Sequence, residues 1–179
     1  MSTFVFPDNT VLCNFAAGDS LYLLKRVLDG AGRWTEAVAR EARRSSHYWP
    51  ALQSLPGAGW LGEPIIIDEP EDILEVERIR RFVLGSDQRK PRKNLGEAQT
   101  LHVIMNWAQF AGAWWISDDR ASVNLARRKG IPSFGTKELM IRAVDAALLD
   151  LDAAFDLLQL INSRRNCLRL PDSPAALRM

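Results

Sequence analysis

The chain is poor in cysteine and histidine, with two of each among 179 residues. Cys13 and Cys167 can form one disulfide at most, which excludes the disulfide-dense scaffolds of small secreted proteins. Two free thiols are typical of a reducing compartment and predict a cytoplasmic protein. The histidines, His47 and His102, are far apart and have no cysteine beside them, so no zinc-binding spacing is present.

Long apolar runs and an excess of one charge are also missing. No stretch approaches the roughly 20 apolar residues that cross a bilayer, and the opening MSTFVFPDNT lacks the basic-then-apolar pattern of a signal peptide. The formal net charge is +1, so no global field indicates a polyanionic partner. A chain of this length with 47% hydrophobic and 25% charged residues predicts one globular domain, not associated with a membrane.

Short apolar runs alternate with amphipathic segments along the chain. The runs at 3–6, 64–68, 113–117 and 131–135 predict strands, and the unbroken apolar pattern of AWWIS (113–117) is typical of a strand buried on both faces. The segments between and after them predict helices at 9–18, 20–28, 35–45, 69–84, 95–111, 119–130 and 137–162. This alternation predicts an α/β sandwich with a short, mostly parallel sheet.

Acidic side chains follow two of the predicted strands directly. Asp8 follows the first, and Asp118 and Asp119 follow AWWIS. Sites in parallel sheets form at the carboxyl ends of the strands, so these acids are expected at one edge. Ionised carboxylates repel one another unless a cation neutralises them, and oxygen-only ligation suits Mg²⁺ or Mn²⁺. The sequence has no Gly-rich phosphate loop and no recognisable Ser/His/Asp elbow as an alternative catalytic set.

Four segments of the chain together span roughly residues 3–160: FVFPDNTVLCNFA, AVAREA, NLGEAQTLHVIMNWA and WWISDDRASVNLARRKGIPSFGT. They resemble the motifs of the PIN domains, a family of metal-dependent ribonucleases that includes the VapC-type toxins of bacterial toxin–antitoxin pairs. The resemblance implies that the catalytic acids are Asp8, Glu41, Glu97 and Asp119, with Asp118 as a close alternative to the last. It also implies supporting polar roles for Asn9 and Thr10 beside the first acid and for Ser117 before the last.

The resemblance implies a PIN-like three-layer α/β/α sandwich over residues 1–165, with an insert around 48–70 and a C-terminal tail at 166–179. The implied function is an endoribonuclease, the toxin of a toxin–antitoxin pair, that cleaves RNA phosphodiesters with Mg²⁺ or Mn²⁺. The implied metal ligands are Asp8, Glu97, Asp118 and Asp119. An antitoxin protein is then the expected partner, and a homodimer stays open. Two other functions also stay open: a PIN fold that no longer cleaves and acts through a protein partner, and a receiver-like domain phosphorylated at Asp118 or Asp119.

The segment GSDQRKPRKN (85–94) is a polar, basic loop that leads into the helix bearing Glu97. Local positive charge at the mouth of an acidic site attracts phosphates, which makes four side chains candidates for RNA contact. They are Arg89, Lys90, Arg92 and Lys93. A solvated loop without a ligand is the competing interpretation.

Structural roles compete for the acids as well. Asp118 is expected to cap the helix that follows it while Asp119 binds the metal. Glu97 lies three residues after Asn94, the spacing of a capping box. Glu41, with arginines on either side, also fits a solvated surface position.

Overall fold

The computed structural model describes residues 3–178 apart from 88, 90 and 91. In chain order the elements are β1 (Val5–Pro7), α1 (Asn9–Ala17), α2 (Leu21–Leu28), α3 (Glu36–Ser45), η1 (Pro50–Ser54), α4 (Leu55–Ala58), α5 (Pro70–Arg78), η2 (Ile79–Val83), α6 (Leu95–Asn106), η3 (Ala108–Phe110), β2 (Trp114–Ile116), α7 (Arg120–Arg128), β3 (Ser133–Phe134), α8 (Thr136–Asp145), α9 (Leu151–Arg165) and η4 (Pro174–Leu177). The element η2 is a single π-helical turn, and η1, η3 and η4 are 3₁₀ turns.

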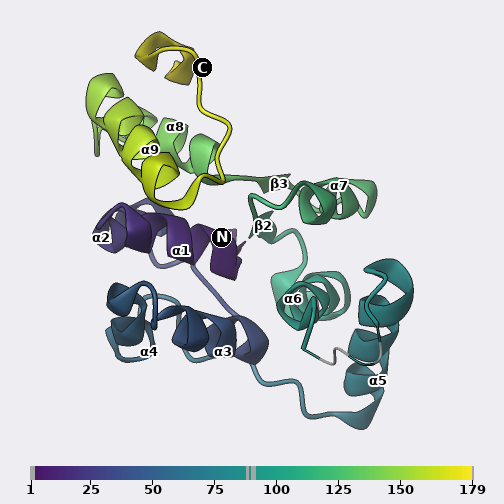
Figure 1. Ribbon diagram of the computed structural model, residues 1–179. Helices are drawn as coiled ribbons and strands as arrows, with labels where there is room; N and C mark the ends of the chain where they lie inside the picture. The colour runs from purple at the N-terminus through teal and green to yellow at the C-terminus, as the bar shows by residue number, and fades with distance from the viewer. Residues whose placement is uncertain (1–2, 88, 90–91, 179) are drawn as a thin grey trace.

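The strands form one parallel sheet in the order β1-β2-β3 (Figure 1). Phe6 pairs with Trp115, and Ile116 pairs with Phe134. This confirms the predicted α/β class and its parallel sheet. Single bridges widen the β1 edge, from Val5 to Gly32 and from Thr35 to Ile65. The strand predicted at 64–68 is therefore reduced to its one bridging residue.

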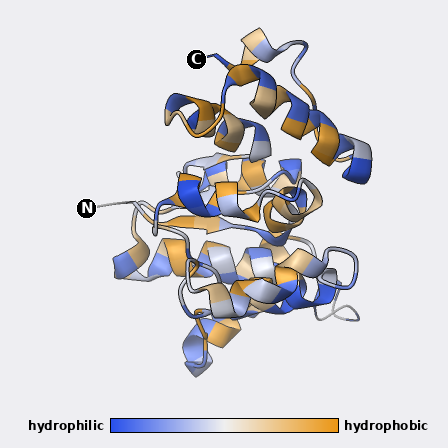
Figure 2. Cartoon of the chain, turned by 90° about the vertical axis from the view of Figure 1, so that its left-hand side faces the viewer, coloured by the Kyte–Doolittle hydropathy of each residue, from blue (hydrophilic) through white to orange (hydrophobic). Residues whose placement is uncertain are grey.

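Helices cover both faces of the sheet. Because successive side chains of each strand point to opposite sides, each strand contributes to a separate core on each face. Val5 and Ile116 pack into a core formed with α1, α2, α3, α8 and α9. Phe6 and Trp115 pack into a second core with α5, α6 and α7. The result is a three-layer α/β/α sandwich whose hydrophobic strands run through the middle of the molecule (Figure 2).

The stretch predicted as one helix at 137–162 is two helices, α8 and α9. The chain turns at Ala147, whose φ of 54° lies in the left-handed region. Asp150 then caps the new helix by accepting a hydrogen bond from Ala153 N at 2.7 Å. The prediction of a single helix was wrong because the Ala- and Leu-rich composition masks this internal cap.

The insert and the tail both contribute to the first core. Leu52, Leu55 and Leu61 of the insert are buried, and so is Leu177 of the tail. In the tail, the Cys167 thiol also donates to Asn14 Oδ1 at 3.2 Å. Both cysteines are unpaired. Among the helices that the structure describes, none combines the length and the hydropathy that a bilayer crossing requires.

Candidate active site

The carboxyl ends of β1 and β2 bring Asp8 and Ser117 together, as the parallel sheet predicts. Asp8 N donates to Ile116 O at 2.9 Å, and Ser117 N donates to Phe134 O at 3.0 Å, so the chains leave the sheet side by side. The Ser117 hydroxyl then donates to Asp8 Oδ2 at 2.5 Å. Ser117 therefore contacts the first acid, Asp8, whereas the sequence places it beside the last one.

Asp8 is buried and held by hydrogen bonds on both carboxylate oxygens. Its Oδ1 accepts from Thr10 Oγ1 at 2.6 Å and from Val11 N at 3.0 Å, which makes Asp8 the N-cap of α1. Burial raises its pKa to about 6 against the lowering effect of these donors, and the charge of Asp118 raises it further. Asn9 points away to Ser45 of α3, at 3.0 Å, and ties α1 to the helix that carries Glu41.

Asp118 is fixed by the Gly135-Thr136 turn and by α1. Thr136 donates to it twice, from its backbone N at 2.8 Å and from Oγ1 at 2.5 Å, and Asn14 Nδ2 donates to Oδ2 at 2.7 Å. A Cβ on Gly135 would lie 2.4 Å from Asp118 Oδ1, so glycine is required there. Burial raises the pKa of Asp118 despite these donors.

Asp119, and not Asp118, caps α7. Its Oδ2 accepts from Ser122 N at 2.8 Å, and its own N–H donates to Ser117 Oγ at 3.1 Å. The expected division of roles, with Asp118 as the cap, was wrong because the Asp118 carboxylate turns back toward Thr136. Asp119 stays exposed, with one oxygen committed to the helix.

Glu41 lies against the N-terminus of α6, where Gly96 makes room for it. A Cβ on Gly96 would approach Glu41 Oε2 to 3.0 Å and Oε1 to 3.2 Å, and the Gly96 backbone donates a hydrogen bond to this carboxylate. Burial raises the pKa of Glu41 to about 7, and the charges of Glu97 and Asp8 act in the same direction. A solvated surface position does not describe this side chain.

Glu97 forms no capping box with Asn94. Asn94 has a φ of 57°, and its side chain donates to Leu84 O at 3.2 Å, so it makes no side-chain cap to the helix. Burial raises the pKa of Glu97, and the charge of Asp119 adds to the effect. Gln99, two residues on, accepts from Ala37 N at 2.9 Å and locks α6 to the start of α3. Glu97 therefore forms no capping box, although its carboxylate accepts a hydrogen bond from its own backbone N–H, which opposes the effect of burial on its pKa.

Burial is the main cause of the raised pKa values of Asp8, Glu41, Glu97 and Asp118. Neighbouring charges add to it: that of Asp118 acts on Asp8, those of Glu97 and Asp8 act on Glu41, and that of Asp119 acts on Glu97. Within the described residues, no three His, Cys, Asp or Glu side chains already stand in a metal-binding arrangement. The atoms of these side chains that could bind a metal are all carboxylate oxygens, the ligand type that Mg²⁺ and Mn²⁺ prefer. The assignment of Asp8, Glu97, Asp118 and Asp119 as metal ligands stays a prediction.

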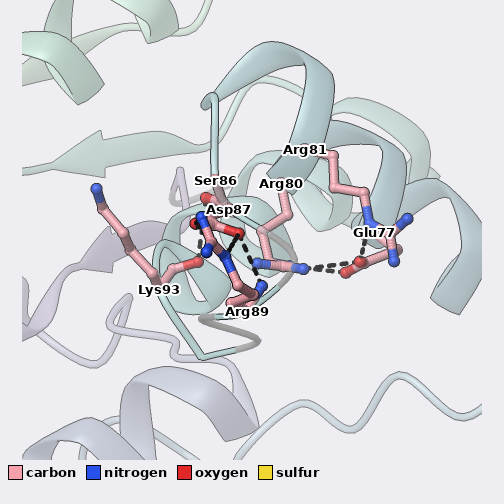
Figure 3. Close-up of polar contacts among 7 residues, drawn as sticks. All are labelled: Glu77, Arg80, Arg81, Ser86, Asp87, Arg89 and Lys93. Carbon is pink, nitrogen blue, oxygen red and sulfur yellow. Dashed lines mark hydrogen bonds and ion pairs between the residues drawn. The ribbon is translucent and has the colours of Figure 1, made fainter.

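The basic loop divides into residues with different surroundings (Figure 3). Arg89 folds back on Asp87, with its backbone N donating to Oδ1 at 2.8 Å and its Nε 3.2 Å from Oδ2. The Lys93 carbonyl accepts from Ser86 Oγ at 3.2 Å, while its side chain extends away from this cluster. Arg92 lines a pocket that contains Glu41. Lys90 lies outside the described residues.

Asn14 and Thr136 both donate hydrogen bonds to Asp118, and the sequence alone does not predict these contacts. Asn14 also donates to Thr136 Oγ1 at 3.1 Å, and both side chains are fully buried. The available signal was a lone amide inside the buried run Val11–Ala17, where a polar side chain needs a partner. Thr136 is the last residue of the segment WWISDDRASVNLARRKGIPSFGT, but its contact with Asp118 does not follow from the sequence.

Comparison of the chain with protein-family models, with curated proteins and with solved structures gave no match. The structure shows a parallel α/β/α sandwich in which Asp8 and Ser117 lie side by side at the carboxyl ends of β1 and β2.

Gly96→Ala tests whether Glu41 needs its place in this cluster. The added Cβ must displace the carboxylate, whereas the helix itself gains from alanine by up to about 1 kcal/mol. We expect a melting temperature within a few degrees of wild type and a roughly 10- to 100-fold loss of any reaction in which the Glu41 carboxylate takes part, because a misplaced group costs about that much. Gly57→Ala is the matched control, since its Cβ would meet nothing within 4 Å. Full activity in Gly96→Ala would remove Glu41 from the site.

Proposed function

We propose that this protein is a metal-dependent endoribonuclease of the PIN type. One observation supports the proposal: acids from four separate segments of the chain have raised pKa values, chiefly because of burial, and several of their charges act on one another. Buried carboxylates are costly without a cation, and perturbed pKa values are characteristic of functional sites. Mg²⁺ or Mn²⁺ bound there would supply hydroxide from water and stabilise negative charge on the phosphorus oxygens.

The positions of the acids suggest a different role for each. Asp8 and Asp118 are held rigidly by Ser117, Thr10, Asn14 and Thr136 and would fix the ion. Asp119 and Glu97, on α7 and α6, would complete the oxygen ligands from the more open side. Glu41, with its pKa near neutrality, would take or hold a proton at its carboxylate beside the reacting phosphate.

The proposal extends to the cellular role. The resemblance to VapC-type toxins makes this chain the toxin of a toxin–antitoxin pair, with RNA as substrate and an antitoxin protein as partner. A homodimer is a further proposal of the same resemblance. The unpaired Cys13 and Cys167 fit the reducing cytoplasm in which such a toxin acts.

Asp119→Asn separates chemistry from structure at this site. Asparagine caps helices as well as aspartate, so α7 should keep its cap and its stability while the ligand charge is lost. We expect RNA binding to persist and cleavage to fall roughly 100-fold or more, as a lost charge-stabilising group costs elsewhere. Asp150→Asn is the matched control, because Asp150 caps α9 by the same bond. If both variants cut RNA as wild type does, Asp119 has no catalytic part.

A further inference from the structure

A pocket of about 280 Å³ opens beside Glu41, between α3 and the chain that enters α6. Four arginines line it, three from α3 and one from the loop before α6: Arg40, Arg43, Arg44 and Arg92. Ala37 and Leu95 supply the apolar wall. The sequence alone does not show that the two segments meet. In the sequence the arginines of α3 are neighbours of Glu41, and Arg92 is part of the basic loop.

Some of the arginines that line this pocket have no carboxylate partner within the described part of the chain. Arg40 forms an ion pair with Glu36, one turn earlier on α3. The Glu41 carboxylate faces the Gly96 backbone, and Arg44 is the guanidinium whose charge lowers its pKa. In the part of the chain that the structure describes, Arg43 and Arg92 form no ion pair with a carboxylate. Guanidinium groups without a carboxylate partner, such as those of Arg43 and Arg92, are suited to bind an oxyanion from outside.

The geometry points to a phosphate-binding pocket for single-stranded RNA, which holds a phosphate next to the one that is cleaved. This inference rests on the proposed function for the identity of the polymer. The volume admits a phosphate with its sugar, and Glu41 in its wall connects the pocket to the acid cluster. A flexible strand can lower its backbone into such a recess, whereas a rigid duplex presents its phosphates on a convex surface. An arginine guanidinium can donate two hydrogen bonds to the phosphate oxygens without reading a base.

The experiment measures binding of fluorescently labelled RNA by anisotropy in EDTA, so that cleavage plays no part. The variant Arg43→Ala/Arg44→Ala/Arg92→Ala should bind about tenfold more weakly, and its salt slope should fall by roughly 0.7 for each phosphate that the pocket no longer holds. The variant Arg43→Lys/Arg44→Lys/Arg92→Lys should keep most of the salt slope but lose affinity, because lysine lacks the fork. Arg92→Glu alone, at an exposed loop position, provides a single change that leaves the α3 arginines in place.

Lys25→Ala/Arg26→Ala on α2 is the matched control, because it removes two exposed charges outside this pocket and should change affinity less than about twofold. Two RNAs of one sequence, with and without a 5′-phosphate, distinguish the source of the bound group. Equal losses on both RNAs show an internal phosphodiester, and a loss confined to the phosphorylated RNA shows a terminal phosphate. Either result supports a phosphate pocket.

Wild-type affinity in the arginine-to-alanine triple variant and in Arg92→Glu would overturn the inference, and so would a wild-type chain that binds neither RNA. A different result would show that the nuclease proposal fails while the pocket is real. In that case wild type binds RNA, the alanine triple variant loses binding, and neither cuts RNA when Mn²⁺ is added. The pocket is then a nucleic-acid site without the chemistry.

Discussion

Asp8→Asn should abolish metal-dependent RNA cleavage while leaving the metal-free protein at least as stable as wild type. The side chain is buried, and its burial raises its pKa to about 6, so the ionised form is unfavourable without a cation. The asparagine carbonyl can still accept from Val11 N, and the hydroxyls of Thr10 and Ser117 can rotate to accept from its amide. The cap of α1 therefore survives, but the ligand charge does not.

The expected loss of cleavage is about 10³-fold or more, since a bound ion contributes several kcal/mol and each 1.4 kcal/mol is tenfold. The measurement is the rate of RNA cleavage in Mn²⁺ together with the melting temperature in EDTA. Asp145→Asn is the control, an exposed acid at the end of α8. A variant that unfolds in EDTA would make Asp8 a structural residue, and one that cuts normally would remove it from the site.

Metal-free protein should lose stability as the pH rises from about 4 to about 7, and Mn²⁺ should reverse the loss. The pKa values of Asp8 and Glu41 rise from 3.8 and 4.5 in their ordinary states to about 6 and about 7 in the folded chain. Between these limits the folded state holds more protons than the unfolded state. Stability is therefore greatest below the unfolded pKa values and falls as the pH passes the folded ones, by roughly 3 kcal/mol for each carboxyl.

Melting curves across this pH range, in EDTA and in Mn²⁺, test the expectation. The metal-induced rise in melting temperature should grow with pH, because protons and metal compete for the same carboxylates. Asp8→Asn should flatten the pH dependence in EDTA and remove most of the rise in Mn²⁺. A melting temperature that climbs with pH in EDTA, or that ignores Mn²⁺ at about pH 8, would contradict a metal site built from these acids.

The elements that position the site could be predicted because local pattern and tertiary role agree in them. AWWIS lies between two helical layers, as its unbroken apolar pattern predicts, and Gly135 precedes Thr136 because a larger residue would collide with Asp118. The roles of Asp118 and Asp119 could not be separated from sequence. Either can cap a helix, and only the tertiary position of Thr136 decides which carboxylate turns inward.

Interactions between distant segments account for the rest of what the sequence could not predict. Asn14 and Asp118 are 104 residues apart, and the arginines of α3 meet Arg92 because α6 packs against α3, where Gln99 accepts a hydrogen bond from Ala37 N. The basic loop is conspicuous in the sequence, but the exposed side chain of Arg89 is paired with Asp87. Charge runs in a sequence do not reveal which members already have a partner in the fold.

Incubation of the wild-type chain with single-stranded RNA, in Mn²⁺ and in EDTA, tests the central claim most directly when the ends of the products are mapped. A metal-dependent endoribonuclease produces internal cuts in Mn²⁺ and leaves the RNA intact in EDTA. RNA that stays intact in Mn²⁺, although the protein binds both the metal and the RNA, would contradict the claim and favour a non-cleaving module that acts through a partner.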